Sequence, residues 1–244
     1  MVVLHHKGVA MIELIFAIVI MAIVLLSAPT LINQSVKSSF VGFQQESINA
    51  IATHMNLILT KNWDVGNANP DVLPVILTVN AGDDDLNMVN LTTARRAGTD
   101  MTSNRSFVST MGGTIAASPS SNFGKDKDTI GTELDDIDDY NDYVTTLKGD
   151  AIGGGVNYID VGITIKTTVS YGSDKPSDGK GYINSEKISF NNPFGNTLLD
   201  STNIKLISAV LTNPDSADEL KKNIRLSAFM CNIGTYTLAI RDGM

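Results

Sequence analysis

Two hydrophobic patterns follow one another along residues 1–63 of the chain. From Val9 to Ile32 the sequence is apolar throughout, except for Glu13 and a few small polar residues near its end. A helix rises about 1.5 Å per residue, so a stretch of this length crosses a hydrocarbon core of about 30 Å. Residues 9–32 are therefore expected to form the transmembrane half of an N-terminal helix.

After Asn33 the continuous apolar stretch gives way to a periodic pattern. Apolar residues recur at steps of three, four and five, with polar residues between them: Val36, Phe40, Phe43, Ile48, Ile51, Met55 and Ile58. This period predicts an amphipathic second half over residues 33–63, whose apolar stripe packs on a globular head. His54 falls on the polar side of the pattern and is expected to be solvated. Breakers after Trp63 predict the end of the helix there.

Pro29 lies between these two halves. A proline removes one backbone hydrogen bond from a helix, and the helical pattern resumes beyond it, so we expect a kink at this residue.

The C-terminal part of the chain has the alternating pattern of strands. Apolar and polar residues alternate strictly from Val161 to Tyr171, as in a half-buried strand. Residues Ile204–Leu211 are apolar on both faces and suit a central strand. Residues Ile224–Cys231 and Tyr236–Ile240 resemble a hairpin. We expect an antiparallel β head over residues 133–244, packed on the long helix, which is an α+β fold.

Residues 64–132 are rich in Asn, Ser, Thr, Gly and Asp. They predict a loop-rich connecting region, with one candidate strand at Ser106–Ile115.

Charge, cysteine content and missing catalytic motifs argue against several classes of function. The formal net charge of the 244 residues is −8 and the pI is about 4.8, which argues against a nucleic-acid partner. Cys231 is the one cysteine, so the chain closes no internal disulfide, and its apolar neighbours predict a buried small side chain. The sequence has no Ser-His-Asp order, zinc-ligand spacing or phosphate-binding glycine loop, so we do not expect an enzyme.

Three interpretations of the N-terminus compete. A cleaved secretory signal has a shorter apolar core than this one. A plain signal anchor explains the hydrophobicity but gives Glu13 no role, although a carboxylate in an apolar span costs about 2.5–3.5 kcal/mol at the bilayer centre. The third interpretation is a signal cut by a prepilin peptidase.

The residues that favour the third interpretation are Lys7-Gly8, the following Val9-Ala10-Met11-Ile12-Glu13-Leu14, and the unbroken apolar run. They resemble the type IV pilin and pseudopilin family. The resemblance implies a leader peptide of residues 1–8, cleavage between Gly8 and Val9, and Glu13 as the fifth mature residue. In that family the glutamate pairs with the N-terminal amine of a neighbouring subunit during filament assembly. The first mature residue is usually Phe and is methylated, whereas here it is Val9.

The same resemblance implies a location and partners. The chain would cross the inner membrane once, with its head in the periplasm, before entering a pilus or pseudopilus. Its partners would be other pilin subunits through the N-terminal helix, the prepilin peptidase and the inner-membrane assembly platform.

An acidic stretch, ELDDIDDYND, occupies residues 133–142. Hard oxygen ligands at this density suit calcium, although the spacing is not that of an EF-hand. The candidate ligands are Asp135, Asp136, Asp138, Asp139 and Asp142. The alternatives are a solvated acidic loop, carboxylates that cap the following strands, or paired catalytic carboxylates, which would lack an aromatic subsite. The chain is otherwise expected to need no cofactor.

The acidic stretch carries a second resemblance, which spans residues 133–231. Asp-Asp-x-Asp-Asp-Tyr ahead of a Tyr/Val/Thr-rich strand is similar to minor pilins of the mannose-sensitive haemagglutinin pilus, the MshD-like type. This resemblance implies a minor pilin that acts in filament biogenesis or initiation. A type II secretion pseudopilin, a signal-anchored periplasmic domain and an adhesin head stay open as alternatives.

Overall fold

The computed structural model describes residues 7–68, 75–88, 94–96, 99–100, 103, 105–109, 112–124, 134–147, 162–213 and 221–234. The chain forms two compact units, Met1–Ile48 and Asn49–Met244. The boundary between the units falls inside the predicted amphipathic half of the helix.

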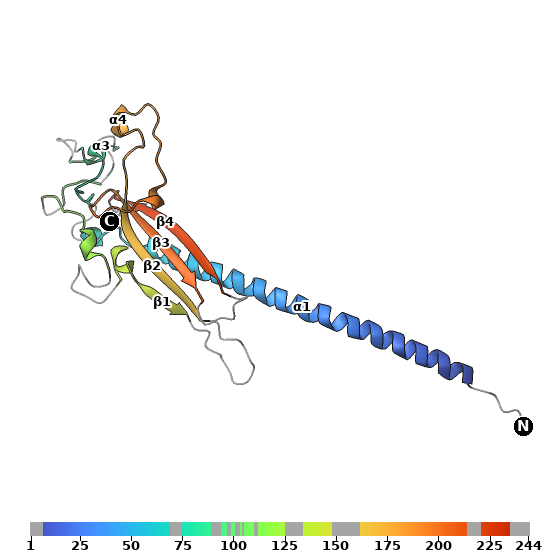
Figure 1. The fold of residues 1–244 in the computed structure, drawn as a ribbon. Coiled ribbons are helices and arrows are strands. Elements are labelled where there is room, and N and C mark those ends of the chain that lie inside the picture. Colours follow the sequence, from blue (N-terminus) through green and yellow to red (C-terminus); the bar gives the residue numbers. More distant parts are fainter. Residues whose placement is uncertain are drawn as a thin grey trace, which may run out of the picture. The chain divides into compact units, whose positions relative to one another are not determined.

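Helix α1 runs from Lys7 to Leu59 (Figure 1). Its first part is apolar and long enough to cross a membrane, as the sequence predicts. The large apolar side chains between Met11 and Ile32 are all at least 47% exposed, so this unit leaves a broad apolar surface without cover from its own chain. A lipid environment would remove this apolar surface from contact with water, which is energetically favourable.

Helix α1 continues through Pro29 without a break. Proline has no N–H to donate to the carbonyl four residues earlier, so the helix loses one bond there. Two hydroxyls bond to backbone carbonyls in this turn: Ser27 Oγ donates to Val24 O at 3.0 Å, and Thr30 Oγ1 donates to Ser27 O at 2.6 Å. The helical continuation is as expected, and the kink itself stays a prediction.

The helix ends four residues before the predicted end at Trp63. The backbone N–H of Lys61 bonds to Ile58 O at 2.9 Å, and Thr60 Oγ1 donates to Leu57 O at 2.6 Å, so the last carbonyls are satisfied locally. The carbonyl of Asn62 accepts instead from the N–H of Ile137 at 3.1 Å. The helix end is therefore capped by local bonds, and the segment that follows it is bonded to the turn before β1.

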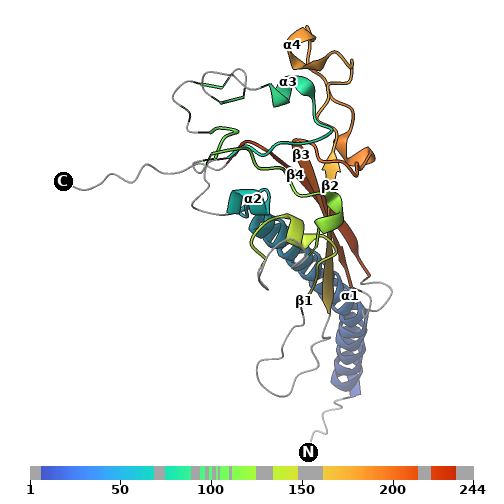
Figure 2. The same cartoon turned by 90° about the vertical axis from the view of Figure 1, so that its left-hand side faces the viewer.

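The second unit contains a four-stranded antiparallel sheet in the order β1-β2-β3-β4 (Figure 1 and Figure 2). The strands are β1 (Val144–Leu147), β2 (Ile163–Gly172), β3 (Ile204–Thr212) and β4 (Asn223–Cys231). The register pairs Thr168 with Ser208, and Ser208 with Ser227. The predicted strands at 204–211 and 224–231 are confirmed, including the central place of β3, and the strand predicted at 161–171 is confirmed from Ile163 onward. The predicted strand Tyr236–Ile240 lies outside the described residues.

The core lies between the inner face of the sheet and the last turns of α1. Ile51, Met55 and Ile58 are at most 2% exposed. On β2 the odd-numbered residues from Ile163 to Tyr171 point inward, and on β3 the same is true of Ile207, Ala209 and Leu211. The predicted apolar stripe of residues 33–63 therefore packs on the sheet through its last turns.

His54 belongs to this core, so the prediction that it is solvated is wrong. It is 9% exposed, its Nε2 lies 2.8 Å from Thr167 Oγ1, and its ring meets that of Tyr140 edge to face at 6.1 Å. The hydroxyl of Thr167 gives the buried imidazole a hydrogen-bond partner. This bond offsets the cost of burying a polar side chain on this side of the helix.

This burial predicts a pH dependence. Burial lowers the pKa of His54 from its ordinary value of 6.5. As the pH falls below about 6.5, the unfolded chain gains a proton that the folded chain binds only at lower pH, so the free energy of unfolding should decrease. The measurement is urea unfolding of the wild type and His54→Gln between about pH 8 and pH 5, followed by fluorescence of Trp63, the one tryptophan. The variant should lose less stability over this range, and parallel curves would contradict the prediction.

The predicted connecting region spans residues 64–132. Its described part contains the short helices α2 (Val65–Ala68) and α3 (Asp84–Asn87), the 3-10 turn η1 (Ser120–Asn122) and isolated bridges. The candidate strand at Ser106–Ile115 is wrong. The chain turns back at Gly112 and Gly113, with φ of 85° and 88°, and forms single bridges instead.

The second half of the chain also carries helix α4 (Gly181–Asn184) and the 3-10 turns η2 (Asp138–Tyr140) and η3 (Pro193–Gly195). Helices α3 and α4 lie side by side beyond one end of the sheet (Figure 2). The N–H of Ile183 donates to Asp85 Oδ2 at 2.8 Å between them.

Candidate functional site

The predicted assembly residues lie at the start of α1. Gly8 and Val9 belong to its first turn. Glu13 follows one turn later, exposed between the exposed Ile12 and Leu14. None of the ion pairs among the described residues involves Glu13. Its carboxylate therefore interrupts an apolar surface and is available to a cation from another molecule.

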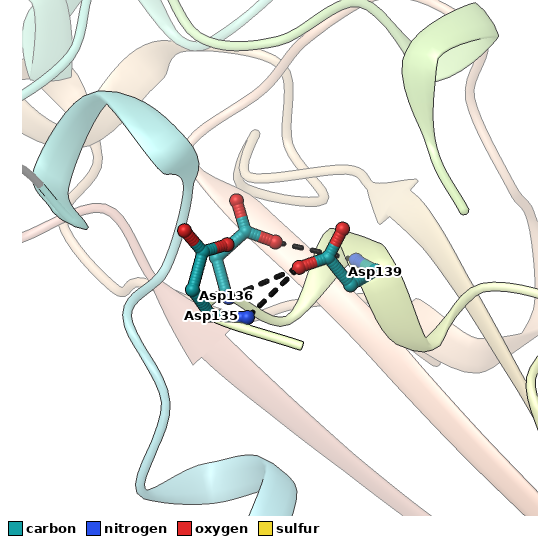
Figure 3. Close-up of side chains that lie close together, drawn as sticks. All are labelled: Asp135, Asp136 and Asp139. Carbon is teal, nitrogen blue, oxygen red and sulfur yellow. Dashed lines mark hydrogen bonds between the residues drawn. The ribbon is translucent and has the colours of Figure 1, made fainter. Parts of the chain in front are cut away.

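The structure divides the acidic stretch among three places. Asp135, Asp136 and Asp139, which we call the acidic turn, come together with one carboxylate oxygen of each within 4.8 Å of the others (Figure 3). Asp142 is exposed and lies 2.9 Å from Lys166 Nζ, and Asp138 turns inward to Lys205. The five predicted calcium ligands thus do not form one site.

Backbone hydrogen bonds hold the acidic turn in place. Asp136 Oδ1 accepts from the N–H groups of Asp138 at 2.7 Å and Asp139 at 3.2 Å. Asp139 Oδ2 accepts from Asp135 N at 3.0 Å and Asp136 N at 3.4 Å (Figure 3). These reciprocal bonds brace the turn itself, and the alternative that the carboxylates cap the following strands stays a prediction.

A solvated acidic loop is excluded here, because Asp136, Asp138 and Asp139 are fully buried. Calcium takes six to eight oxygen ligands, and the acidic turn offers three carboxylates as part of such a set. Calcium binding at these three residues stays a prediction.

A buried lysine is the feature that sequence analysis missed. Lys205 points inward from the central strand β3 and is completely buried. Its Nζ lies 2.8 Å from Asp64 Oδ2, 2.5 Å from Asp138 Oδ2 and 2.8 Å from the carbonyl of Trp63. We call Lys205, Asp64 and Asp138 the buried ion cluster. The signal in the sequence was a lysine at an inward position of a strand otherwise assigned as apolar.

Aromatic rings enclose the buried ion cluster. The ring centroids of Trp63, Phe123 and Tyr171 lie 4.1, 5.1 and 5.5 Å from Lys205 Nζ. All three side chains are at most 6% exposed, so they exclude water from the ammonium while their π faces attract it. The phenol of Tyr171 donates to Ser118 O at 2.6 Å.

The two carboxylates of the cluster differ in their surroundings. Asp64 accepts from Gly66 N at 3.0 Å, from Ser118 N at 2.9 Å and from Ser118 Oγ at 3.2 Å, besides Lys205. Asp138 Oδ1 is buried without a hydrogen-bond partner among the described residues. Burial raises the pKa of Asp138 well above its ordinary value, and the negative charges of Asp136 and Asp64 add to this against the pull of Lys205.

Cys231 is exposed at the end of β4, so the prediction that it is buried is wrong. Side chains alternate along β4, and Cys231 shares the outward face with Phe229 and Ser227. Apolar neighbours in sequence therefore misled the prediction.

The outer face of the sheet carries a shallow groove of about 570 Å³. Seven of its lining residues carry hydroxyl groups: Thr164, Thr168, Ser170, Thr197, Ser208, Thr212 and Ser227. Lys166, Arg225 and Phe194 add two cations and an aromatic ring. Val144, Leu206 and Val210 add apolar surface between these polar groups, so the groove has a mixed lining.

These features define an α+β chain with a helix long enough to span a membrane and a four-stranded antiparallel head. No family model matches this chain, and no curated protein or solved structure matches it.

Proposed function

We propose that this chain is a minor type IV pilin-like subunit, cleaved after Gly8 and built into a pilus or pilus-like filament. The observation that carries the proposal is Glu13, a lone carboxylate on the exposed apolar surface of α1 and five residues beyond the proposed cut. Its position near the end of a membrane-spanning helix suits an ion pair between subunits.

The energetics of α1 support this role. In a membrane the apolar side chains are covered by lipid, and in a filament they would be covered by the helices of other subunits. Glu13 costs free energy in either place unless it meets a cation. A new amine at Val9 of a neighbouring subunit supplies that cation, so correct docking would relieve the cost.

The proposed location follows from the same helix. Before assembly α1 holds the chain in the inner membrane with its head in the periplasm, in contact with the prepilin peptidase and the assembly platform. The proposed task is biogenesis or initiation of the filament, as the resemblance to minor pilins of the mannose-sensitive haemagglutinin type implies. A type II secretion pseudopilin uses the same helix and cleavage, so it is the second candidate.

Mass spectrometry of the mature N-terminus tests the proposal. In cells with prepilin peptidase the chain should begin at Val9, and in cells without it the chain should keep residues 1–8. Gly8→Val should block cleavage because a protease approaches this backbone closely. Gly42→Val is the matched control in the same helix, where an added Cβ meets nothing within 4 Å. A native chain that keeps its first eight residues would contradict the filament proposal and leave only a membrane-tethered domain.

A further inference from the structure

We propose that Lys205 and Asp138 form an amide bond, an intramolecular cross-link made with loss of one water molecule. This inference concerns the head alone and does not rest on the proposed function of α1. Its basis is the buried ion cluster, in which an amine and two carboxylates are already in contact.

The geometry places the reacting groups together. The contact between Lys205 Nζ and Asp138 Oδ2 is 2.5 Å, the shortest within the cluster. Both side chains are at most 1% exposed. Such contact replaces an encounter in solution with a reaction inside one molecule, which removes most of the entropic barrier.

Asp138 has the properties of the acceptor. Nucleophiles attack the neutral carboxylic acid rather than the carboxylate, and the buried Asp138 favours its neutral form. Its Oδ1, which has no hydrogen-bond partner among the described residues, is the oxygen that would carry the proton.

Asp64 has the properties of the proton acceptor. Three donors from Gly66 and Ser118 stabilise its carboxylate. Its Oδ2 also lies 2.8 Å from Lys205 Nζ, within reach of a lysine proton.

The step balances with these three groups. Lys205 gives one ammonium proton to Asp64 Oδ2, and the neutral amine attacks Cγ of Asp138 to form the new C–N bond. A second proton from the nitrogen joins the hydroxyl of Asp138, the C–O bond breaks, and water leaves. The nitrogen keeps one hydrogen as an amide, and Asp64 keeps the proton it accepted. No oxidant or further reactant is needed. The aromatic rings keep solvent from the site, which opposes the reverse hydrolysis.

The bond would join β3 to the turn that precedes β1, across 67 residues of sequence. A force that pulls the chain apart could not then separate these parts of the head. Such a link would keep this loop closed even in denaturant.

The test is mass spectrometry of the full-length protein, purified from cells without prepilin peptidase so that residues 1–8 are kept, and denatured in detergent. The intact mass should fall short of the sequence mass by one water. Tryptic digestion should give a branched peptide in which the segment containing Lys205 is joined to the segment containing Asp138. The branched peptide is essential, because dehydration of an aspartate elsewhere also removes a water. An intact mass equal to the sequence mass, or a branch at any other residue, would overturn the proposal.

Two variants complete the test. Asp64→Asn keeps both reacting groups and removes the proton acceptor, so it should show the full sequence mass in most molecules. The pair Lys166 and Asp142 lies at 2.9 Å but is exposed, with side-chain exposures of 55% and 69%. Lys166→Met should therefore keep the branched peptide, and loss of the peptide in this variant would contradict the assignment to Lys205.

Discussion

Replacing Glu13 with alanine should leave the chain in the membrane and remove it from filaments. The substitution deletes the carboxylate from an apolar helix, so insertion becomes easier. The proposed pairing with the Val9 amine of a neighbour is lost, and that amine stays buried without a partner in the filament. We expect the fraction of the chain in sheared filaments to fall at least about tenfold, which corresponds to about 1.4 kcal/mol of docking free energy.

Immunoblots of sheared filaments and of the membrane fraction measure this effect. Leu14→Ala is the matched control, because Leu14 is the exposed neighbour of Glu13 and carries no charge. Glu13→Gln separates charge from size and should behave like Glu13→Ala. Normal incorporation of Glu13→Ala would remove the main support for the filament proposal while leaving the membrane helix unaffected.

Replacing Lys205 with methionine should destabilise the head by about 3–5 kcal/mol, the usual cost of removing one partner of a buried ion pair. The variant leaves Asp64 and Asp138 facing each other without the ammonium that lies 2.8 and 2.5 Å from them. The amide proposed above would increase the loss, since the wild type alone would carry it. Urea unfolding in detergent near pH 7 measures the effect, with Trp63 as the probe because its ring is 4.1 Å from Lys205 Nζ.

Lys166→Met provides the comparison. Its ion pair has nearly the same distance, 2.9 Å, but is exposed, and exposed pairs contribute about 0–1 kcal/mol. A variant that combines Lys205→Met with Asp64→Asn and Asp138→Asn should regain part of the lost stability, because it also removes the two carboxylates. Equal free energies of unfolding for Lys205→Met and Lys166→Met would contradict the prediction that the buried ion cluster contributes more to stability than the exposed pair.

The elements predicted with success depend on local pattern. The apolar run from Val9 to Ile32 and the alternation in β2 both extend over many residues. In β2, every second residue lies on the same face of the strand. The central place of β3 followed from apolar residues on both of its faces. Such patterns are readable because burial acts on a helix or strand as a whole.

The errors share a different cause. His54 and Cys231 were judged from neighbours in sequence, and Lys205 was overlooked within an apolar strand, whereas the surroundings of all three come from distant segments. Thr167 satisfies His54, Asp64 and Asp138 satisfy Lys205, and the pleat of β4 turns Cys231 outward. A polar group becomes acceptable inside only when a partner arrives from elsewhere in the chain.

The sequence by itself determined the long apolar helix, its lone carboxylate and the antiparallel strands, because these depend on the order of residues within one element. Only the tertiary structure decided that the acidic stretch is divided among a capped turn, an exposed ion pair and a buried lysine. The physical reason is that an aspartate has the same local pattern whether it meets water, a backbone N–H or an ammonium. Its role is fixed by which of these the folded chain places within hydrogen-bond distance.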